Sequence, residues 1–239
     1  MLLGGISGGT GCDQVQSTSS GSFSVLKNKM QIAKWVFGNH CDGFGGIENL
    51  DAESLTYLSL GGSSAQIQPW SSIQPLSVLT NLNYLNFSYA TSLKDLNGLS
   101  SLTNLETLGA SHCAINDVSA LSGLTNLKTL NLSYNKITNI TAIGTLTGLT
   151  SLNLQNNSIS DLSPLKNLIN PETGKIGFTS LNLSNNSLEG TVTAGNSNVE
   201  TLRVLHNAGL TKITITGNNF NYNDLTKLQE IFGTKNVIN

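Results

Sequence analysis

A 22-residue pattern of apolar and polar positions repeats along the middle of the chain. Leu99–Ala120, Leu121–Ala142 and Ile143–Pro164 are equal in length and carry apolar residues at the same offsets. In the second of these units the stretch TLNLS alternates, which predicts a short strand with Leu130 and Leu132 on one face and polar side chains on the other. Such a strand cannot bury its apolar face alone, so we expect consecutive units to stack.

Stacking at ~4.8 Å, the spacing of paired strands, produces a continuous parallel sheet over a leucine-filled interior. The rest of each unit must return the chain along the opposite side, through one short helical or 3₁₀ turn. The pattern continues upstream from Leu76 with one inserted residue, and regains its phase downstream at Leu181 after an interruption. We therefore predict an α/β solenoid over residues 50–220, an arc with a concave parallel β-sheet and short helical or 3₁₀ turns on its convex side.

The repeat resembles the leucine-rich repeat family, in the 22-residue subclass of bacterial internalins and of phosphatase-regulating nuclear repeat proteins. The family pattern LxxLxLxxNxI is met in two consecutive units, by Leu127, Leu130, Leu132, Asn135 and Ile137 and by Leu149, Leu152, Leu154, Asn157 and Ile159. The resemblance implies the same arc and a role in binding another protein.

Two polar columns recur with the repeat. The turn that leaves each strand carries Asn135, Asn157, Asn186 and Asn218. An amide both donates and accepts, so we expect this column to satisfy backbone groups of the turns above and below it. Cys113 stands at the same offset, where we expect structural packing rather than a reactive thiol.

The second column holds Asp95, Asp117, Asn139 and Asp161. Its periodicity favours turn capping over acid/base chemistry.

The two ends of the chain depart from the repeat. Residues 22–49 are predicted to form an N-terminal helical cap, because Ser22–Phe37 has apolar residues at helical spacing and Gly38 follows as a stop. Residues 221–239 are predicted to form a C-terminal cap helix over Asn221–Gly233. Caps of this kind cover the open edges of a sheet.

The register is ambiguous before the C-terminal cap. Leu202 and Ile213 both fit the first apolar position of a strand, yet they are only 11 residues apart, so one of them belongs to the return side. We expect Leu202, Val204, Ile213 and Ile215 to be buried in either case. If the strand begins at Leu202, Arg203 joins the concave face.

The chain has few charged residues and almost no net charge, and this makes several kinds of binding partner unfavourable. Charged residues make up 11% of the chain, against about 25% in ordinary soluble domains. A net charge of −2 argues against nucleic acid as a partner and against a polybasic membrane patch. No apolar run approaches the roughly 20 residues of a membrane-spanning helix. The abundant Asn and Ser supply the polarity.

Residues 1–21 are predicted to be a flexible leader or the remnant of a lipoprotein-type signal. The stretch before Cys12 resembles the end of a bacterial lipoprotein signal, in which a small residue precedes a cysteine that becomes lipidated. Gly9 stands at a position where such signals usually have Leu or Val, and no Lys or Arg precedes this stretch. Cys12 is therefore the candidate for a lipid anchor.

Catalysis finds no support in the sequence. The three histidines stand outside any recognisable catalytic or phosphate-binding motif, and the three cysteines lack metal-ligand spacing. We predict no catalytic residue, no metal site and no cofactor.

The concave face is the candidate binding surface. Exposed aromatic side chains on a rigid sheet are typical anchors for protein recognition, since they offer large area at little entropic cost. The aromatic residues fall in the N-terminal half, and amides extend the surface. The candidate contact residues are Tyr57, Tyr84, Asn86, Tyr89, His112, Asn131, Tyr134, Asn153, Gln155 and Asn156. The alternative is that these are ordinary solvated strand residues.

Three functions remain open. The first is a secreted or surface-attached bacterial module, expected to be monomeric, which recognises another protein through the concave face. The second is an intracellular scaffold or regulatory subunit of a phosphatase-like partner, with a cytoplasmic location. The third is a carbohydrate- or ice-binding surface formed by the Asn and Ser/Thr columns.

Overall fold

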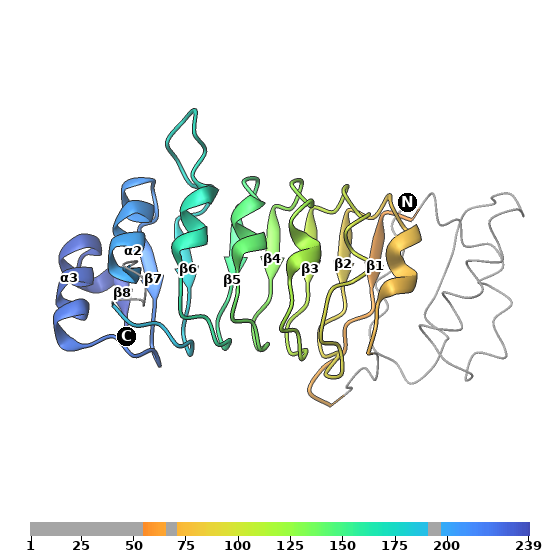
Figure 1. Ribbon diagram of the computed structural model, residues 1–239, viewed down its shortest axis with the longest axis horizontal. Coiled ribbons are helices and arrows are strands. Elements are labelled where there is room, and N and C mark those ends of the chain that lie inside the picture. Colours follow the sequence, from red (N-terminus) through yellow and green to blue (C-terminus); the bar gives the residue numbers. More distant parts are fainter. Residues whose placement is uncertain (1–54, 66–70, 191–196) are drawn as a thin grey trace, which may run out of the picture.

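The computed structural model describes residues 55–65, 71–190 and 197–239, and these form one parallel sheet of eight strands. The strands lie side by side in chain order along the length of the molecule, and the helices line one face of the sheet (Figure 1). The strands are β1 (Tyr57–Ser59), β2 (Tyr84–Asn86), β3 (Thr107–Gly109), β4 (Thr129–Asn131), β5 (Ser151–Asn153), β6 (Ser180–Asn182), β7 (Lys212–Thr214) and β8 (Val237–Ile238). This is the predicted α/β solenoid.

The sheet keeps each apolar position of the repeat opposite the same position of its neighbour. Leu85 pairs with Leu108, Leu108 with Leu130, and Leu130 with Leu152. All four leucines are at most 5% exposed. The polar residues on either side of them face away from the interior and are partly or fully exposed. The alternation in the sequence therefore decides which face of the sheet is concave and wet.

The chain returns on the convex side through short helices, as predicted. Four are 3₁₀ helices of three to six residues, namely η5 (Gln74–Val78), η6 (Ser119–Leu121), η7 (Thr141–Thr145) and η8 (Ser163–Leu168). Two longer α-helices follow, α2 (Asn198–Asn207) and α3 (Tyr222–Phe232), and η9 (Thr234–Asn236) leads into β8. The interruption in the repeat is a turn over 170–175, closed by hydrogen bonds between Asn170 and Lys175 and between Gly174 and Asn170.

The asparagine column binds the backbone of its own turn and of the preceding repeat. The Asn157 side chain accepts from Ile137 N–H at 3.0 Å and donates to the carbonyls of Leu132 at 2.9 Å and Leu154 at 3.1 Å. Asn135, Asn186 and Asn218 repeat this arrangement. The column therefore satisfies backbone groups of its own turn and of the preceding one, as expected, whereas the expected side-chain bonds to the following turn are not formed by these described residues.

The second polar column caps the turns, as the periodicity predicted. Asp117 Oδ1 accepts from Ser119 N–H at 2.8 Å, and Asp161 Oδ1 accepts from Ser163 N–H at 2.8 Å. Asn139 does the same for Thr141 N–H. These bonds lower the pKa of the Asp117 carboxyl, because the Ser119 backbone N–H stabilises its ionised form. The column is structural.

The ambiguous register near the C-terminus is resolved in favour of Ile213. Ile213 lies in β7, and Leu202 lies in α2 on the convex side, so Arg203 is a helix residue and is not on the concave face. Leu202, Ile213 and Ile215 are buried as expected, but Val204 is only half-buried. That expectation was wrong because helical spacing places Leu205 inside instead.

Of the two predicted caps, only the C-terminal one falls within the described residues. The predicted N-terminal cap, the leader and Cys12 lie outside the described residues. At the other end, α3 packs beside α2, burying Leu228 and Phe232. β8 then adds an eighth strand to the sheet, paired with β7 through Ile213 and Val237. The helical pattern did not predict this strand, because two residues are too few to show alternation.

Candidate functional site: the concave face

The first aromatic pair stands where the first two strands begin. β1 and β2 are in register, so Tyr57 lies directly opposite Tyr84. Their rings stack with centroids 4.2 Å apart and an interplanar angle of 11°. Both residues are half-buried, and burial raises the pKa of the Tyr84 hydroxyl. Later strands carry Thr107, Thr129 and Ser151 at this position, so the aromatic surface ends after the second strand.

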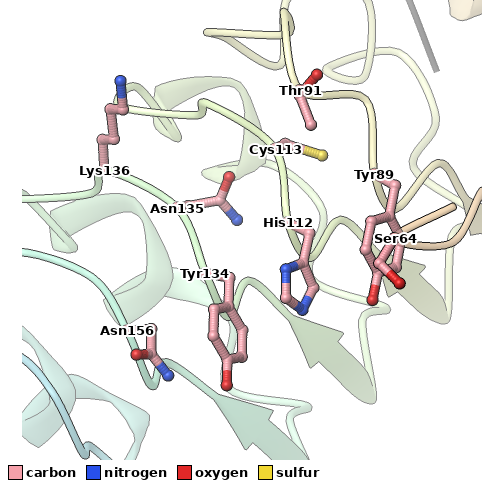
Figure 2. Close-up of a pocket in the computed structure, with 9 residues that line it drawn as sticks. All are labelled: Ser64, Tyr89, Thr91, His112, Cys113, Tyr134, Asn135, Lys136 and Asn156. Atoms are coloured by element: carbon pink, nitrogen blue, oxygen red, sulfur yellow. The ribbon is translucent and has the colours of Figure 1, made fainter. Parts of the chain in front are cut away.

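A second aromatic stack stands at the opposite ends of the strands, just beyond their carboxyl ends. The His112 imidazole lies between two phenol rings, 4.5 Å from Tyr89 and 4.0 Å from Tyr134 between centroids. The interplanar angles are 2° and 12°, so the three rings are nearly parallel. Figure 2 shows the three rings in a row, with the hydroxyl ends of the two tyrosines pointing the same way. The sequence grouped all five aromatic residues together, and the structure divides them into two stacks.

The second stack occupies a left-handed backbone position. Tyr89, His112 and Tyr134 have φ of 68°, 54° and 58°. Bulky residues seldom adopt this conformation, which favours Gly, Asn and Asp. The C-terminal half of the same column carries Asn156 and Asn185, with φ of 55° and 52°, and then Gly217 with φ of 72°. Sequence reasoning selected these side chains but missed their left-handed backbone, although the succession of Asn and Gly at one offset indicates it.

An open pocket of about 540 Å³ lies beside the second stack. The described residues that line it are Ser64, Tyr89, Thr91, His112, Cys113, Tyr134, Asn135, Lys136 and Asn156 (Figure 2). None of these is acidic. Lys136 is exposed, and it forms no ion pair with any described residue. The pocket is therefore aromatic, polar and weakly basic.

The polar tips of the stack are unengaged. Within the described ranges, neither tyrosine hydroxyl nor either imidazole nitrogen of the Tyr89–His112–Tyr134 stack has a hydrogen-bond partner. Tyr134 is 43% exposed, the most open of the three. These groups are available to a ligand without any internal bond being broken.

The amides of the candidate surface are mostly committed to the protein. Asn86 Oδ1 accepts from Ser88 N–H at 3.0 Å and from Ser88 O–H at 2.8 Å. Asn131 binds Ser133 in the same way, and Asn153 Oδ1 accepts from Gln155 N–H at 3.2 Å. Gln155 Oε1 in turn accepts from Asn182, and Asn156 Oδ1 accepts from Asn185. Their first role is to hold the strand ends in shape.

Cys113 borders the pocket without offering reactive chemistry. Its Sγ lies 3.7 Å from the Phe87 carbonyl oxygen and 3.5 Å from that of Ser111. Burial raises the pKa of the Cys113 thiol to about 11, so the thiol stays protonated at neutral pH. Structural packing is the reading that this environment favours.

Among the described residues, no three His, Cys, Asp and Glu side chains group together in a way that could hold a metal ion. No helix among them is both long and apolar enough to cross a bilayer.

Comparison with known proteins identifies the repeats. A family model for leucine-rich repeats (2 copies) matches residues 103–144 and 125–167. A comparison with curated protein sequences finds no significant match.

Solved structures give the same fold. An internalin (inlF) of Listeria monocytogenes is 29% identical with a TM-score of 0.58, covering 74% of this chain and 46% of its own. Internalin C2 of the same organism is 28% identical with a TM-score of 0.56, covering 74% and 69%. A leucine-rich repeat protein of Leptospira interrogans, 21% identical, covers 75% and 42% with a TM-score of 0.57 and shares the fold. This chain thus spans a little under half of the first internalin. The chain thus contains leucine-rich repeats and resembles the internalins.

Proposed function

We propose that the chain is a non-catalytic module that binds another protein through the N-terminal half of its concave face. The observation that carries the proposal is the Tyr89–His112–Tyr134 stack, which stands at left-handed backbone positions with its polar tips unbonded. The leucine-rich repeat fold supports a binding role, since such solenoids present long concave surfaces.

Energetics explain why the stack favours binding over a purely structural role. The left-handed conformation costs roughly 1–2 kcal/mol for each L residue that has a side chain, and less for Asn. Aromatic stacking returns only about 0.5–1.5 kcal/mol per pair. Asn156 and Asn185 show that the same repeat frame accepts the residue that the backbone prefers. Three bulky rings at such positions therefore add little to stability, and unfavourable conformations of this kind cluster at binding sites.

A carbohydrate-binding surface is less compatible with the stack. A sugar ring packs on the open face of an aromatic ring, whereas here the rings cover one another. Both faces of the His112 imidazole and one face of each tyrosine are occupied at 4.0–4.5 Å. The stack presents edges and polar tips, which suit the mixed chemistry of a protein surface. Ice binding needs an unbroken column, and Gly109 interrupts the Asn column between Asn86 and Asn131.

Secretion or surface attachment is the second part of the proposal. The internalin resemblance and the low fraction of charged residues support it, and Cys12 is the residue through which a lipid would attach. An intracellular scaffold remains the alternative. Fractionation of the producing cell tests the choice. We expect the protein outside the cytoplasm, with a lipid-dependent detergent partition that Cys12→Ala abolishes, and unprocessed cytoplasmic protein would refute this part.

Affinity capture of a partner from extracts tests the binding face. One variant replaces the second stack by the residue that later repeats carry, Y89N/H112N/Y134N, and a second replaces the first pair by threonine, Y57T/Y84T. The control is Tyr222→Asn, because Tyr222 is 82% exposed on α3, away from the concave face. We expect loss of about 2 kcal/mol or more of binding free energy in the first variant, as for hot-spot aromatic residues.

The asparagine variants are chosen so that folding is preserved. Unfolding free energy by urea should stay within about 1 kcal/mol of the unchanged chain, since the relief of backbone strain offsets the lost stacking. A captured partner that binds the first variant and the Tyr222 control equally well would place the contact surface elsewhere.

A further inference from the structure

The pocket beside the second aromatic stack has a chemical preference of its own. The hydrogen-bond donors along it include the hydroxyls of Tyr89 and Tyr134, an imidazole N–H of His112 and the ammonium of Lys136. Carboxylates are absent from its described lining. An ionised carboxylate only accepts hydrogen bonds, so its requirements match what this pocket offers.

The charges of the pocket lining also favour a carboxylate as ligand. The chain as a whole carries a net charge of −2, yet the described pocket residues include one basic side chain and no acidic one. Lys128, by contrast, is 2.9 Å from Glu106 and is already neutralised. Lys136 has no such counter-ion among the described residues. A ligand carboxylate would supply it.

The spacing of the donors favours a segment with more than one acidic side chain. The two tyrosine hydroxyls are separated by the intervening imidazole, with ring spacings of 4.5 and 4.0 Å on either side of it. The two outer rings are thus roughly 8.5 Å apart, which favours two carboxylates over one. In an extended peptide, side chains i and i+2 leave the backbone on the same side about 6.8 Å apart, and the flexible side chains of Glu can diverge to span the remaining distance.

We propose that the Tyr89–His112–Tyr134 stack and Lys136 form a site for an acidic segment of the protein partner, with Asp or Glu at alternate positions of an extended stretch. The inference rests on the proposed function and specifies the chemistry of the partner. The tyrosine and imidazole edges donate hydrogen bonds to the carboxylates, and Lys136 supplies the opposite charge.

The test uses the full chain and a defined peptide, so it does not require the natural partner. A capped Glu-Ser-Glu-Ser-Glu peptide and its Gln-Ser-Gln-Ser-Gln counterpart are titrated while the ring signals of Tyr89, His112 and Tyr134 are followed by NMR. We expect the Glu peptide to shift these signals and the Gln peptide to bind more weakly, by about two- to fivefold for each exposed ion pair lost. Raised salt should remove most of the difference.

Substitution of the lysine identifies its role. Lys136→Gln should weaken binding of the Glu peptide about two- to fivefold and leave that of the Gln peptide unchanged. Lys94→Gln is the matched control, because Lys94 is also exposed but does not line the pocket. Inorganic phosphate is titrated in parallel.

Each result decides the proposal. Equal binding of the two peptides, an unchanged Lys136→Gln variant, or phosphate binding more tightly than the Glu peptide would overturn the acidic-peptide assignment. So would the absence of any shift. If partner capture still depends on the aromatic stack in those cases, the proposed binding face stands. If capture does not depend on it, the proposed function fails independently.

Discussion

Side chains at one backbone position divide the concave face into two halves. After β2, β3 and β4 the left-handed residue is aromatic, and after β5 and β6 it is Asn156 or Asn185. The aromatic half stacks ring on ring, whereas the amide half forms a hydrogen bond, 3.0 Å from Asn185 Nδ2 to Asn156 Oδ1. The rings form no hydrogen bond with any described residue, so their polar tips are free. The residue type at this one offset thus separates a hydrogen-bonded pair of amides from a stack whose polar groups are unbonded.

The Cys113 thiol gives a prediction at the same scale. In a chain with Cys12 and Cys41 replaced by Ser, alkylation of folded Cys113 at pH 8 should be slow, because with a pKa of about 11 only about 1 in 1000 thiols is ionised. The rate should rise about tenfold per pH unit towards pH 11, whereas in urea it should level off near the ordinary value of about 8.5. Mass spectrometry of the carbamidomethylated protein measures both.

The raised pKa of the Cys113 thiol also makes the stability of the fold depend on pH. Folding favours the protonated thiol, so the contribution of Cys113 is fully present below the ordinary thiol pKa. It is lost as pH rises towards 11, where the unfolded chain releases its proton first. A folded-state alkylation rate that levels off below pH 9 would contradict this account.

The turns that follow β4, β5, β6 and β7 each depend on one asparagine. The Asn157 amide connects two repeats by bonding Ile137 N–H and the Leu132 carbonyl of the preceding unit as well as the Leu154 carbonyl of its own. Water cannot replace the Asn157 amide as a partner of these backbone groups, because Ile137, Leu132 and Leu154 are buried. The turn is thereby fixed relative to its neighbour, and the left-handed residue before it is fixed as well.

Asn157→Ala should therefore destabilise the fold by about 1–3 kcal/mol, the usual cost of leaving buried polar groups unpaired. Urea denaturation measures the change. Asn126→Ala is the control, because Asn126 is exposed and makes one convex-side bond, 2.8 Å to the Thr103 carbonyl, so its loss should cost no more than about 0.5 kcal/mol. Equal losses in the two variants would show that the turn column is not a special source of stability.

The whole molecule is a linear stack in which each repeat contacts its neighbours. Strand pairing runs from β1 to β8 without a crossover, and the buried leucines form one continuous core. Stability in such a solenoid is a sum of repeats and interfaces, so a repeat with one neighbour is less stable than one with two. β8 has only two residues, and Ile238 is 41% exposed. The C-terminal end should open before the centre.

Hydrogen exchange can measure this gradient. The Ile215 N–H bonds to the Ile238 carbonyl of β8 at 2.7 Å, and the Leu132 N–H bonds to Asn153 in the centre at 3.0 Å. We expect the Ile215 amide to exchange about tenfold faster or more, which corresponds to about 1.4 kcal/mol less opening free energy. Equal protection at the two amides would show that the described repeats open as one unit.

The local pattern was sufficient for much of the architecture. Alternation around Leu130 and Leu152 identifies the strands, and the recurrence of Asn and Asp identifies turn residues and caps, because each depends on neighbours within one repeat. The pattern failed where two neighbouring segments fitted a strand equally well. Leu202 and Ile213 both fit a strand start, and Val204 was expected to be buried, yet the segment around Leu202 is helical. What excludes a strand there is the pairing of β7 with β6, a contact between distant residues.

The candidate site shows the same division between local and long-range information. The sequence by itself determined that the aromatic residues lie in the N-terminal half of a leucine-rich, low-charge solenoid, because alternation and period assign each side chain to a face. Only the tertiary structure decided that Tyr57 and Tyr84 form one stack and Tyr89, His112 and Tyr134 another, with Lys136 beside the second. Stacking joins residues of different repeats whose distance and backbone conformation depend on how those repeats pack, and no single repeat contains that information.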